Sequence, residues 1–110
     1  MSTSQRKKRE SFITLTIEGN YKDFKDFYDN NKEVIYRGIV ETFEGLKTDR
    51  RKKLTLLVLG KICDFEWDTE FHFSKTDTKT LLRDVMPFFE QIEDYETCSE
   101  IKKLHDCLTI

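Results

Sequence analysis

The chain of 110 residues carries 19 Lys and Arg against 21 Asp and Glu, which gives a net charge of −2. This length allows one continuous core and leaves no room for a second domain of ordinary size. No apolar run approaches the ~20 residues that cross a bilayer, and no apolar segment follows the charged N-terminus as in a signal peptide, so a soluble protein is expected.

The first ten residues are polar and contain the basic run Arg6, Lys7, Lys8 and Arg9. Such a segment cannot bury enough apolar area to offset the entropy lost on ordering. We therefore expect a flexible basic arm over residues 1–10, followed by a single α+β domain over residues 11–110.

The stretch "FITLTIE", residues 12–18, alternates apolar and polar side chains. Ile13, Leu15 and Ile17 share one face of the pattern and two threonines share the other, which is the period of a half-buried strand. The Gly-Asn pair that follows is expected to end this strand.

Two helices are expected next. Asn20 is a candidate N-cap for a short helix rich in aromatic residues. Asn30, with Glu33 three residues further on, forms the capping-box pattern of a second helix with an amphipathic apolar stripe. Gly45 is the expected end of that second helix.

After the charged segment "TDRRKK" at residues 48–53, two strands are expected to form a hairpin. A two-residue turn at Cys63 and Asp64 seats the smallest side chain opposite the largest and puts Lys61 across from Glu66. Because Cys-Asp is an unfavoured pair for such a turn, a longer or bulged turn stays open. The register pairs Leu54 with Phe73, Leu56 with Phe71, Val58 with Thr69, Gly60 with Trp67 and Ile62 with Phe65.

Beyond Ser74 the apolar period becomes helical and is interrupted by Pro87. Proline cannot donate the interior hydrogen bond, so it either kinks one helix or begins a new one. A last helix is expected over residues 95–108. The order βααββαα predicts an α+β fold in which helices pack on a small antiparallel sheet in two layers.

The polar face of the third strand presents a row of acids and one histidine: Asp64, Glu66, Asp68, Glu70 and His72. Carboxylates two residues apart on a strand can share a hard cation or divide acid and base roles. A strand face in solvent supplies neither the burial nor the convergent third group that such chemistry needs. We therefore predict no metal, cofactor or catalytic residue and expect these acids to meet solvent or a partner.

Two leucines share that polar face, since Leu57 lies opposite Glu70 and Leu59 opposite Asp68. Three explanations are open: helices cover the face, the first strand flanks the leucines, or they belong to an interface with another copy or another protein. At an interface each buried leucine would contribute roughly 1.5 to 3 kcal/mol. The predicted protein interface comprises Leu57, Leu59, Glu66, Asp68 and Glu70.

The three cysteines, Cys63, Cys98 and Cys107, form neither a disulfide framework nor a CxxC pair, which favours the reducing cytoplasm. On a helix, Cys107 points about 200° away from His105, so a zinc site there is not expected. The absence of alanine, with abundant Lys, Ile and Phe, is typical of AT-rich coding and favours a small accessory protein of a phage, another virus or a low-GC bacterium.

The leading hypothesis is a non-enzymatic protein-interaction or regulatory module, expected as a homo-oligomer, with the charged C-terminal helices as a further surface. The alternative is nucleic-acid binding through Arg6, Lys7, Lys8, Arg9, Arg50, Arg51, Lys52 and Lys53, which could neutralise several phosphates. The charge distribution argues against the alternative, because residues 1–63 carry +5 but residues 64–110 carry −7. Nucleic-acid binders usually present a basic domain, whereas the sheet and the C-terminal helices here would repel a phosphate backbone.

Overall fold

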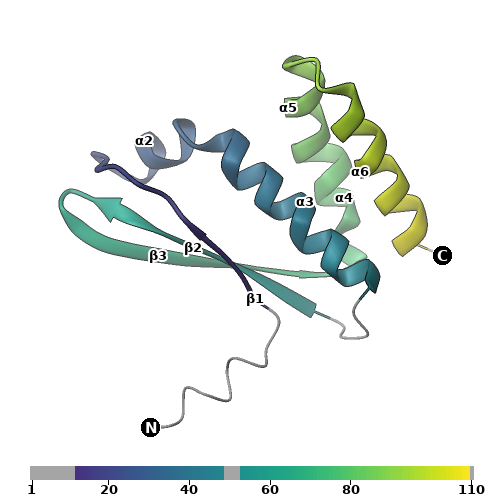
Figure 1. The fold of residues 1–110 in the computed structure, drawn as a ribbon, viewed down its shortest axis with the longest axis horizontal. Helices are drawn as coiled ribbons and strands as arrows, with labels where there is room; N and C mark the ends of the chain where they lie inside the picture. The colour runs from purple at the N-terminus through teal and green to yellow at the C-terminus, as the bar shows by residue number, and fades with distance from the viewer. Residues whose placement is uncertain (1–11, 49–52, 110) are drawn as a thin grey trace, which may run out of the picture.

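The computed structural model describes residues 12–48 and 53–109 (Figure 1). The expected basic arm and three residues of the second basic run, 50–52, lie outside this range. Three strands, β1 (Phe12–Thr16), β2 (Lys53–Ile62) and β3 (Phe65–Ser74), form one sheet in the order β1-β2-β3. The helices lie on one side of this sheet, so the predicted two-layer α+β architecture is confirmed.

The sheet is mixed, because β1 pairs with β2 in parallel and β2 pairs with β3 antiparallel. The wholly antiparallel sheet expected from the sequence is therefore wrong for β1. Between β1 and β2 the chain forms α2 (Phe24–Asp29) and α3 (Lys32–Thr48). This two-helix connection carries the chain back over the sheet, so that β2 starts at the same end as β1 and runs in the same direction.

The predicted hairpin register is confirmed at every pair, from Leu54↔Phe73 to Ile62↔Phe65. Cys63 and Asp64 form the two-residue turn with φ of 53° and 69°, a left-handed backbone that neither residue favours. Hydrogen bonds from a distant segment stabilise it: Asn20 Oδ1 accepts from the Asp64 amide at 2.8 Å, and the Tyr21 carbonyl accepts from the Cys63 amide at 2.7 Å. The chain that follows β1 thus fixes a turn which the sequence pair alone would not select.

The sequence predicted Asn20 as the N-cap of the first helix and Asn30 as the N-cap of the second, and both predictions are wrong. Asp23, rather than Asn20, caps α2, because its side chain accepts from the Asp26 amide at 2.8 Å. Asn30 ends α2 instead of starting α3: its side-chain amide donates to the Asp26 carbonyl at 2.7 Å. Asn20 is engaged with the hairpin turn, which removes it from any helix.

Helix α3 packs closely on β2, and its glycines allow the approach. A Cβ on Gly45 would lie 2.7 Å from Leu54 Cδ1, and one on Gly38 would lie 3.3 Å from Leu56 Cδ1. Gly45 therefore sits inside the helix, which continues to Thr48, and the predicted stop at Gly45 is wrong. Its small size serves helix-to-strand packing.

The C-terminal helical layer begins with a short 3₁₀ turn, η1 (Lys75–Asp77), and α4 (Thr78–Thr80). A π-helical turn, η2 (Leu81–Val85), then leads into α5 (Met86–Gln91), which has Pro87 in its first turn. The wider turn accommodates Pro87, which has no N–H to donate and would crowd the carbonyl four residues before it. The last helix, α6 (Tyr95–Leu108), has the predicted bounds.

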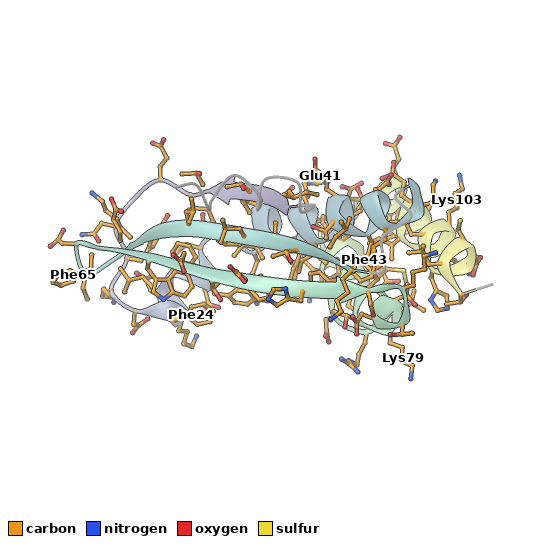
Figure 2. The ribbon with its side chains drawn as sticks, turned by 90° about the horizontal axis from the view of Figure 1, so that it is seen from below. Phe24, Glu41, Phe43, Phe65, Lys79 and Lys103 are labelled. Carbon is orange, nitrogen blue, oxygen red and sulfur yellow. The ribbon has the colours of Figure 1, made fainter. Side chains whose placement is uncertain are left out.

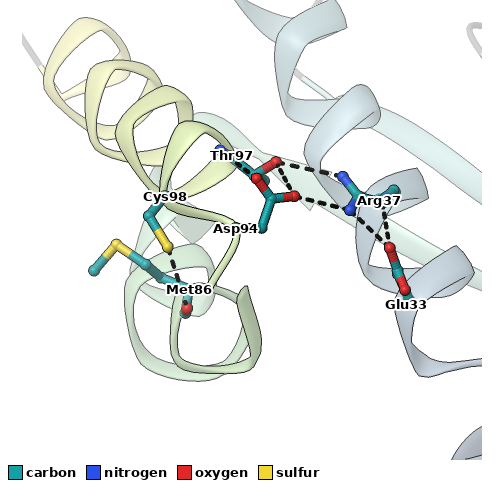
Figure 3. A network of polar contacts seen from close by, with 6 residues as sticks. All are labelled: Glu33, Arg37, Met86, Asp94, Thr97 and Cys98. Carbon is teal, nitrogen blue, oxygen red and sulfur yellow. Dashed lines mark hydrogen bonds and ion pairs between the residues drawn. The ribbon is translucent and has the colours of Figure 1, made fainter. Parts of the chain in front are cut away.

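One arginine links the two helical segments (Figure 3). Arg37 on α3 donates to Asp94 at 2.8 Å and to Glu33 at 2.7 Å, and its guanidinium lies 4.8 Å from the centre of the Phe89 ring. Asp94 is also the N-cap of α6, where it accepts from the Thr97 amide. The network therefore fixes the start of α6 against α3.

The core lies between the helices and one face of the sheet. Its fully buried side chains include Phe43 of α3, Leu56 and Val58 of β2, and Leu81 and Phe89 of the C-terminal layer. Within the part of the chain that the structure describes, no helix combines the length and hydropathy needed to cross a bilayer.

Candidate functional site

The face of the sheet away from the helices has no element packed on it among the described residues (Figures 1 and 2). Figure 2 looks onto this side, with β2 and β3 in front of the helices. Strand alternation assigns every second residue to it. We call it the uncovered face, made up of Thr14 and Thr16 of β1, Lys53, Thr55, Leu57, Leu59 and Lys61 of β2, and Glu66, Asp68, Glu70 and His72 of β3.

Leu57 and Leu59 lie at the centre of the uncovered face. Both are half-buried and stand outside the core cluster of the described residues. Their burial comes from neighbouring strands: Leu57 is flanked by Thr14 and Glu70, and Leu59 by Thr16 and Asp68. The sequence left three explanations open for these two leucines. The structure shows that β1 flanks them and that no helix of the described residues covers them.

The predicted acids form an exposed row along β3. Glu66, Asp68 and Glu70 are exposed, and Lys61 stands opposite Glu66 as the register predicted. Asp64 is not part of this row, because it belongs to the turn and its carboxylate accepts from the Asn20 side chain at 2.7 Å. In the two rows that contain Leu57 and Leu59, the uncovered face thus changes from a hydroxyl group on β1 to a leucine on β2 and a carboxylate on β3.

Near the end of this face where β2 starts and β3 ends, a hydroxyl, an imidazole and a carboxylate lie in a row within hydrogen-bonding distance of one another. Thr55 Oγ1 lies 3.0 Å from His72 Nδ1, and His72 Nε2 lies 3.2 Å from Glu70 Oε1. The same three groups act in hydrolase triads, but catalysis there also requires exclusion of water and an oxyanion site. The His72 and Glu70 side chains are 60% and 50% exposed. Water therefore reaches both groups, whereas such catalysis needs a site that excludes water.

A hollow of about 660 Å³ lies at the hairpin end of the sheet and opens onto the uncovered face. Its lining includes four carboxylates and a single lysine: Glu18, Asp64, Glu66, Asp68 and Lys61. Over residues 12–48 and 53–109, no group of three or more His, Cys, Asp or Glu side chains is placed to hold a metal ion. The hollow therefore offers negative charge to a cationic side chain rather than a coordination site.

Six of the ten lysines of the described chain gather at the opposite end. There α3 ends, β2 starts, β3 ends and α6 finishes (Figure 1). Lys79 and Lys103 lie at this end in Figure 2, and the Lys53↔Ser74 pair brings Lys53 beside Lys75. We call this the lysine end, formed by Lys47, Lys53, Lys75, Lys79, Lys102 and Lys103, all of them exposed. It contains Lys53, the one described member of the predicted basic runs.

The three cysteines lie at separate places in the fold. Cys63 is exposed and its thiol donates to the Lys22 carbonyl at 2.9 Å. Burial raises the pKa of the Cys98 thiol, which contacts the Met86 carbonyl at 3.8 Å (Figure 3). Cys107 is exposed. The contacts of Cys63 and Cys98 are therefore local and structural.

Comparison with protein-family models, with curated proteins and with solved structures finds no match for this chain. The function is therefore inferred from the geometry of the chain's own surfaces. Sequence reasoning identified the leucines and acids of the uncovered face and placed Lys61 opposite Glu66, but it missed Thr14 and Thr16 as members of that face. The alternation of these threonines is visible in the sequence, yet only the pairing of β1 with β2 shows that they share one face with the acids.

Proposed function

We propose that the protein is a non-enzymatic interaction module that binds another protein chain through the uncovered face. The supporting observation is the position of Leu57 and Leu59: they occupy the centre of a sheet face without joining the core. An apolar pair ringed by polar groups is the arrangement of a small protein-binding patch. The exposed, strand-borne acids beside it favour recognition over chemistry, because an open strand face does not exclude water.

A random-peptide library displayed on phage tests this proposal. The selection uses the immobilised wild-type protein, and each enriched peptide is then measured on a Leu57→Thr/Leu59→Thr variant. Threonine keeps the preference for strand structure and removes the apolar pair. The expected result is binding to the wild type and loss of binding to the variant. Enriched peptides that bind both proteins equally, or a selection that enriches none, would contradict the proposal.

Light scattering over a range of protein concentrations tests the predicted homo-oligomer. If the uncovered face joins two copies, the wild type has the mass of a dimer and the Leu57→Thr/Leu59→Thr variant has the mass of a monomer. A monomeric wild type excludes a second copy as the partner and leaves another protein.

The lysine end supports a second candidate function, binding of nucleic acid. Six exposed lysines from α3, β2, η1, α4 and α6 present positive charge at one end, and phosphate contacts depend on such charge. A structural role is the competing explanation for Lys47, which lies in the last turn of α3 and stabilises the dipole of that helix. Fluorescence anisotropy with labelled single- and double-stranded DNA at about 50 mM salt decides between them. Affinity that falls with salt and with Lys53→Gln/Lys75→Gln/Lys79→Gln supports binding, and no measurable affinity removes it.

A further inference from the structure

We infer that the uncovered face takes an amphipathic helix of a partner protein, with the apolar stripe of that helix on Leu57 and Leu59 and a Lys- or Arg-rich flank over β3. This inference rests on the proposed function and names the partner's chemistry. Its evidence comes from the type of strand pairing, the size of the face and the order of chemical groups across it.

The composition of β2 and its pairing with β1 favour a second layer. β1 and β2 form a parallel pair within this mixed sheet, and sheets made wholly of parallel strands have both faces covered, usually by helices. The segment from Leu54 to Leu59 is apolar at every position but one, a run typical of a strand buried on both sides. The structure supplies α3 and the C-terminal helices on one side only. A helix on the other side would complete a three-layer arrangement.

The size of the face suits one helix. Strands β2 and β3, with ten residues each at ~3.3 Å per residue, make the face roughly 33 Å long, and the five-residue β1 widens it to roughly 15 Å over about half of that length. A helix with its side chains is about 10–12 Å wide, and ~20 residues of it span 30 Å. The area of this face is on the order of 400 Å², which is below the ~800 Å² per partner of a standard interface between folded proteins.

The charges favour a basic helix. Glu66, Asp68 and Glu70 flank the leucines on the β3 side, while Thr14 and Thr16 flank them on the β1 side. A helix along β2 would therefore place one flank against carboxylates and the other against hydroxyl groups. At the hairpin end, a lysine or arginine of the helix would enter the hollow among its four carboxylates. Complementary charge of this kind sets orientation as well as affinity.

A second copy fits the same face less well. Face-to-face stacking through a two-fold axis across the strands sets β3 over β3 and acid against acid. With the axis along the strands, Glu70 and Asp68 of each copy face Thr14 and Thr16 of the other and meet no cation. In neither arrangement are the carboxylates of β3 neutralised, whereas a basic helix neutralises them.

The test uses three synthetic peptides of about 20 residues, a length that matches the face. The first carries leucines at helical spacing i, i+3, i+4 and i+7 with lysines along one flank. In the second, glutamates replace the lysines, and the third is a scramble of the first without amphipathic order. Calorimetry measures affinity for the full chain, and amide chemical shifts of the ¹⁵N-labelled protein map the contact.

Only the lysine peptide is expected to bind with shifts centred on Leu57, Leu59 and Asp68. A Glu66→Gln/Asp68→Asn/Glu70→Gln variant should lower its affinity about tenfold, because the charge complementarity is lost. The matched control, Glu41→Gln/Glu90→Gln/Glu100→Gln, removes the same charge from exposed positions on the helical side and should leave affinity unchanged. Three results would overturn the inference. They are an equal loss of affinity in the two triple variants, equal affinity for the lysine and glutamate peptides, or chemical-shift changes confined to the helices.

The library selection separates this inference from the proposed function. If the lysine peptide fails but selected peptides of another kind require Leu57 and Leu59, the face binds proteins and the helical partner is wrong. If the lysine peptide fails and the selection enriches nothing that depends on the two leucines, both are wrong.

Discussion

The two faces of the sheet come from the same three strands, yet their side chains differ in burial and in the groups that surround them. On the covered face, Leu54, Leu56 and Val58 of β2 are buried under α3, and their neighbours fit by size, as Gly38 and Gly45 show. On the uncovered face, Leu57 and Leu59 are half-buried between hydroxyls and carboxylates. Adjacent residues of one strand therefore belong either to the core or to the partly exposed surface of the sheet.

The difference teaches that apolar content alone does not define a core. The leucines at 56 and 57 are neighbours in the chain, but only Leu56 contacts a layer that excludes water. Stability should depend on the covered face and binding on the uncovered one. Each of the following substitutions tests that division.

The largest effect is expected from truncating neighbouring leucines. Leu56→Ala removes a fully buried side chain against α3 and should cost about 2–5 kcal/mol of unfolding free energy, because a cavity remains. Leu57→Ala should cost under about 1 kcal/mol, since the side chain is half-buried and outside the core. Urea unfolding of both variants measures the two values. Equal losses would show that the division between the faces is wrong.

A smaller but still clear loss is expected at the hairpin end of the covered face. A Cβ on Gly60 would lie 2.3 Å from Phe27 Cε1, and Phe27 is buried. Gly60→Ala should therefore cost about 1–3 kcal/mol through overpacking. It should also change the fluorescence of Trp67, whose ring centre lies 5.1 Å from that of Phe27. Lys61→Ala, one residue further on and on the uncovered face, is the control and should change neither.

The smallest effect concerns the pH dependence of the helical layer. The hydrogen bond from Arg37 to Asp94 lowers the pKa of that carboxyl. Because the folded pKa lies below the unfolded value of about 3.9, the ionised form favours folding above that value. The stabilisation is lost as pH falls from about 3.9 through the folded pKa.

Thermal unfolding between about pH 5 and pH 2.5 measures this effect, with the window set by that unfolded pKa. The melting temperature of Asp94→Asn should fall less steeply with decreasing pH than that of the wild type. Arg37→Gln should flatten the curve in the same way, because it removes the cation that causes the shift. Slopes identical to wild type in both variants would show that the Arg37–Asp94 pair does not contribute.

The sequence predicted the hairpin well because its register follows from period-two alternation and from the match of Gly60 to Trp67. It also located Leu57, Leu59 and the acids on one polar face. These features are local to two neighbouring strands, so side-chain pattern and size determine them.

The sequence failed where distant segments decide local structure. Asparagine is a common N-cap residue. The Asn20 side chain instead supports the turn at Cys63 and Asp64, more than 40 residues away. Gly45 resembles a helix end, yet contact with Leu54 requires its small size inside α3. The parallel pairing of β1 also depends on how the two-helix connection crosses the sheet. Tertiary packing determines these three features, and the pattern of residue types along the chain does not reveal that packing.

The most direct test of the central claim is the thermal unfolding of the Leu57→Thr/Leu59→Thr variant. If the two leucines serve a binding surface, the melting temperature should stay within about 4–8 °C of wild type, which corresponds to ~1 kcal/mol for a domain of this size. A fall well beyond that range, or loss of cooperative unfolding, would show that both leucines belong to the core. The uncovered face would then be part of what holds the protein together.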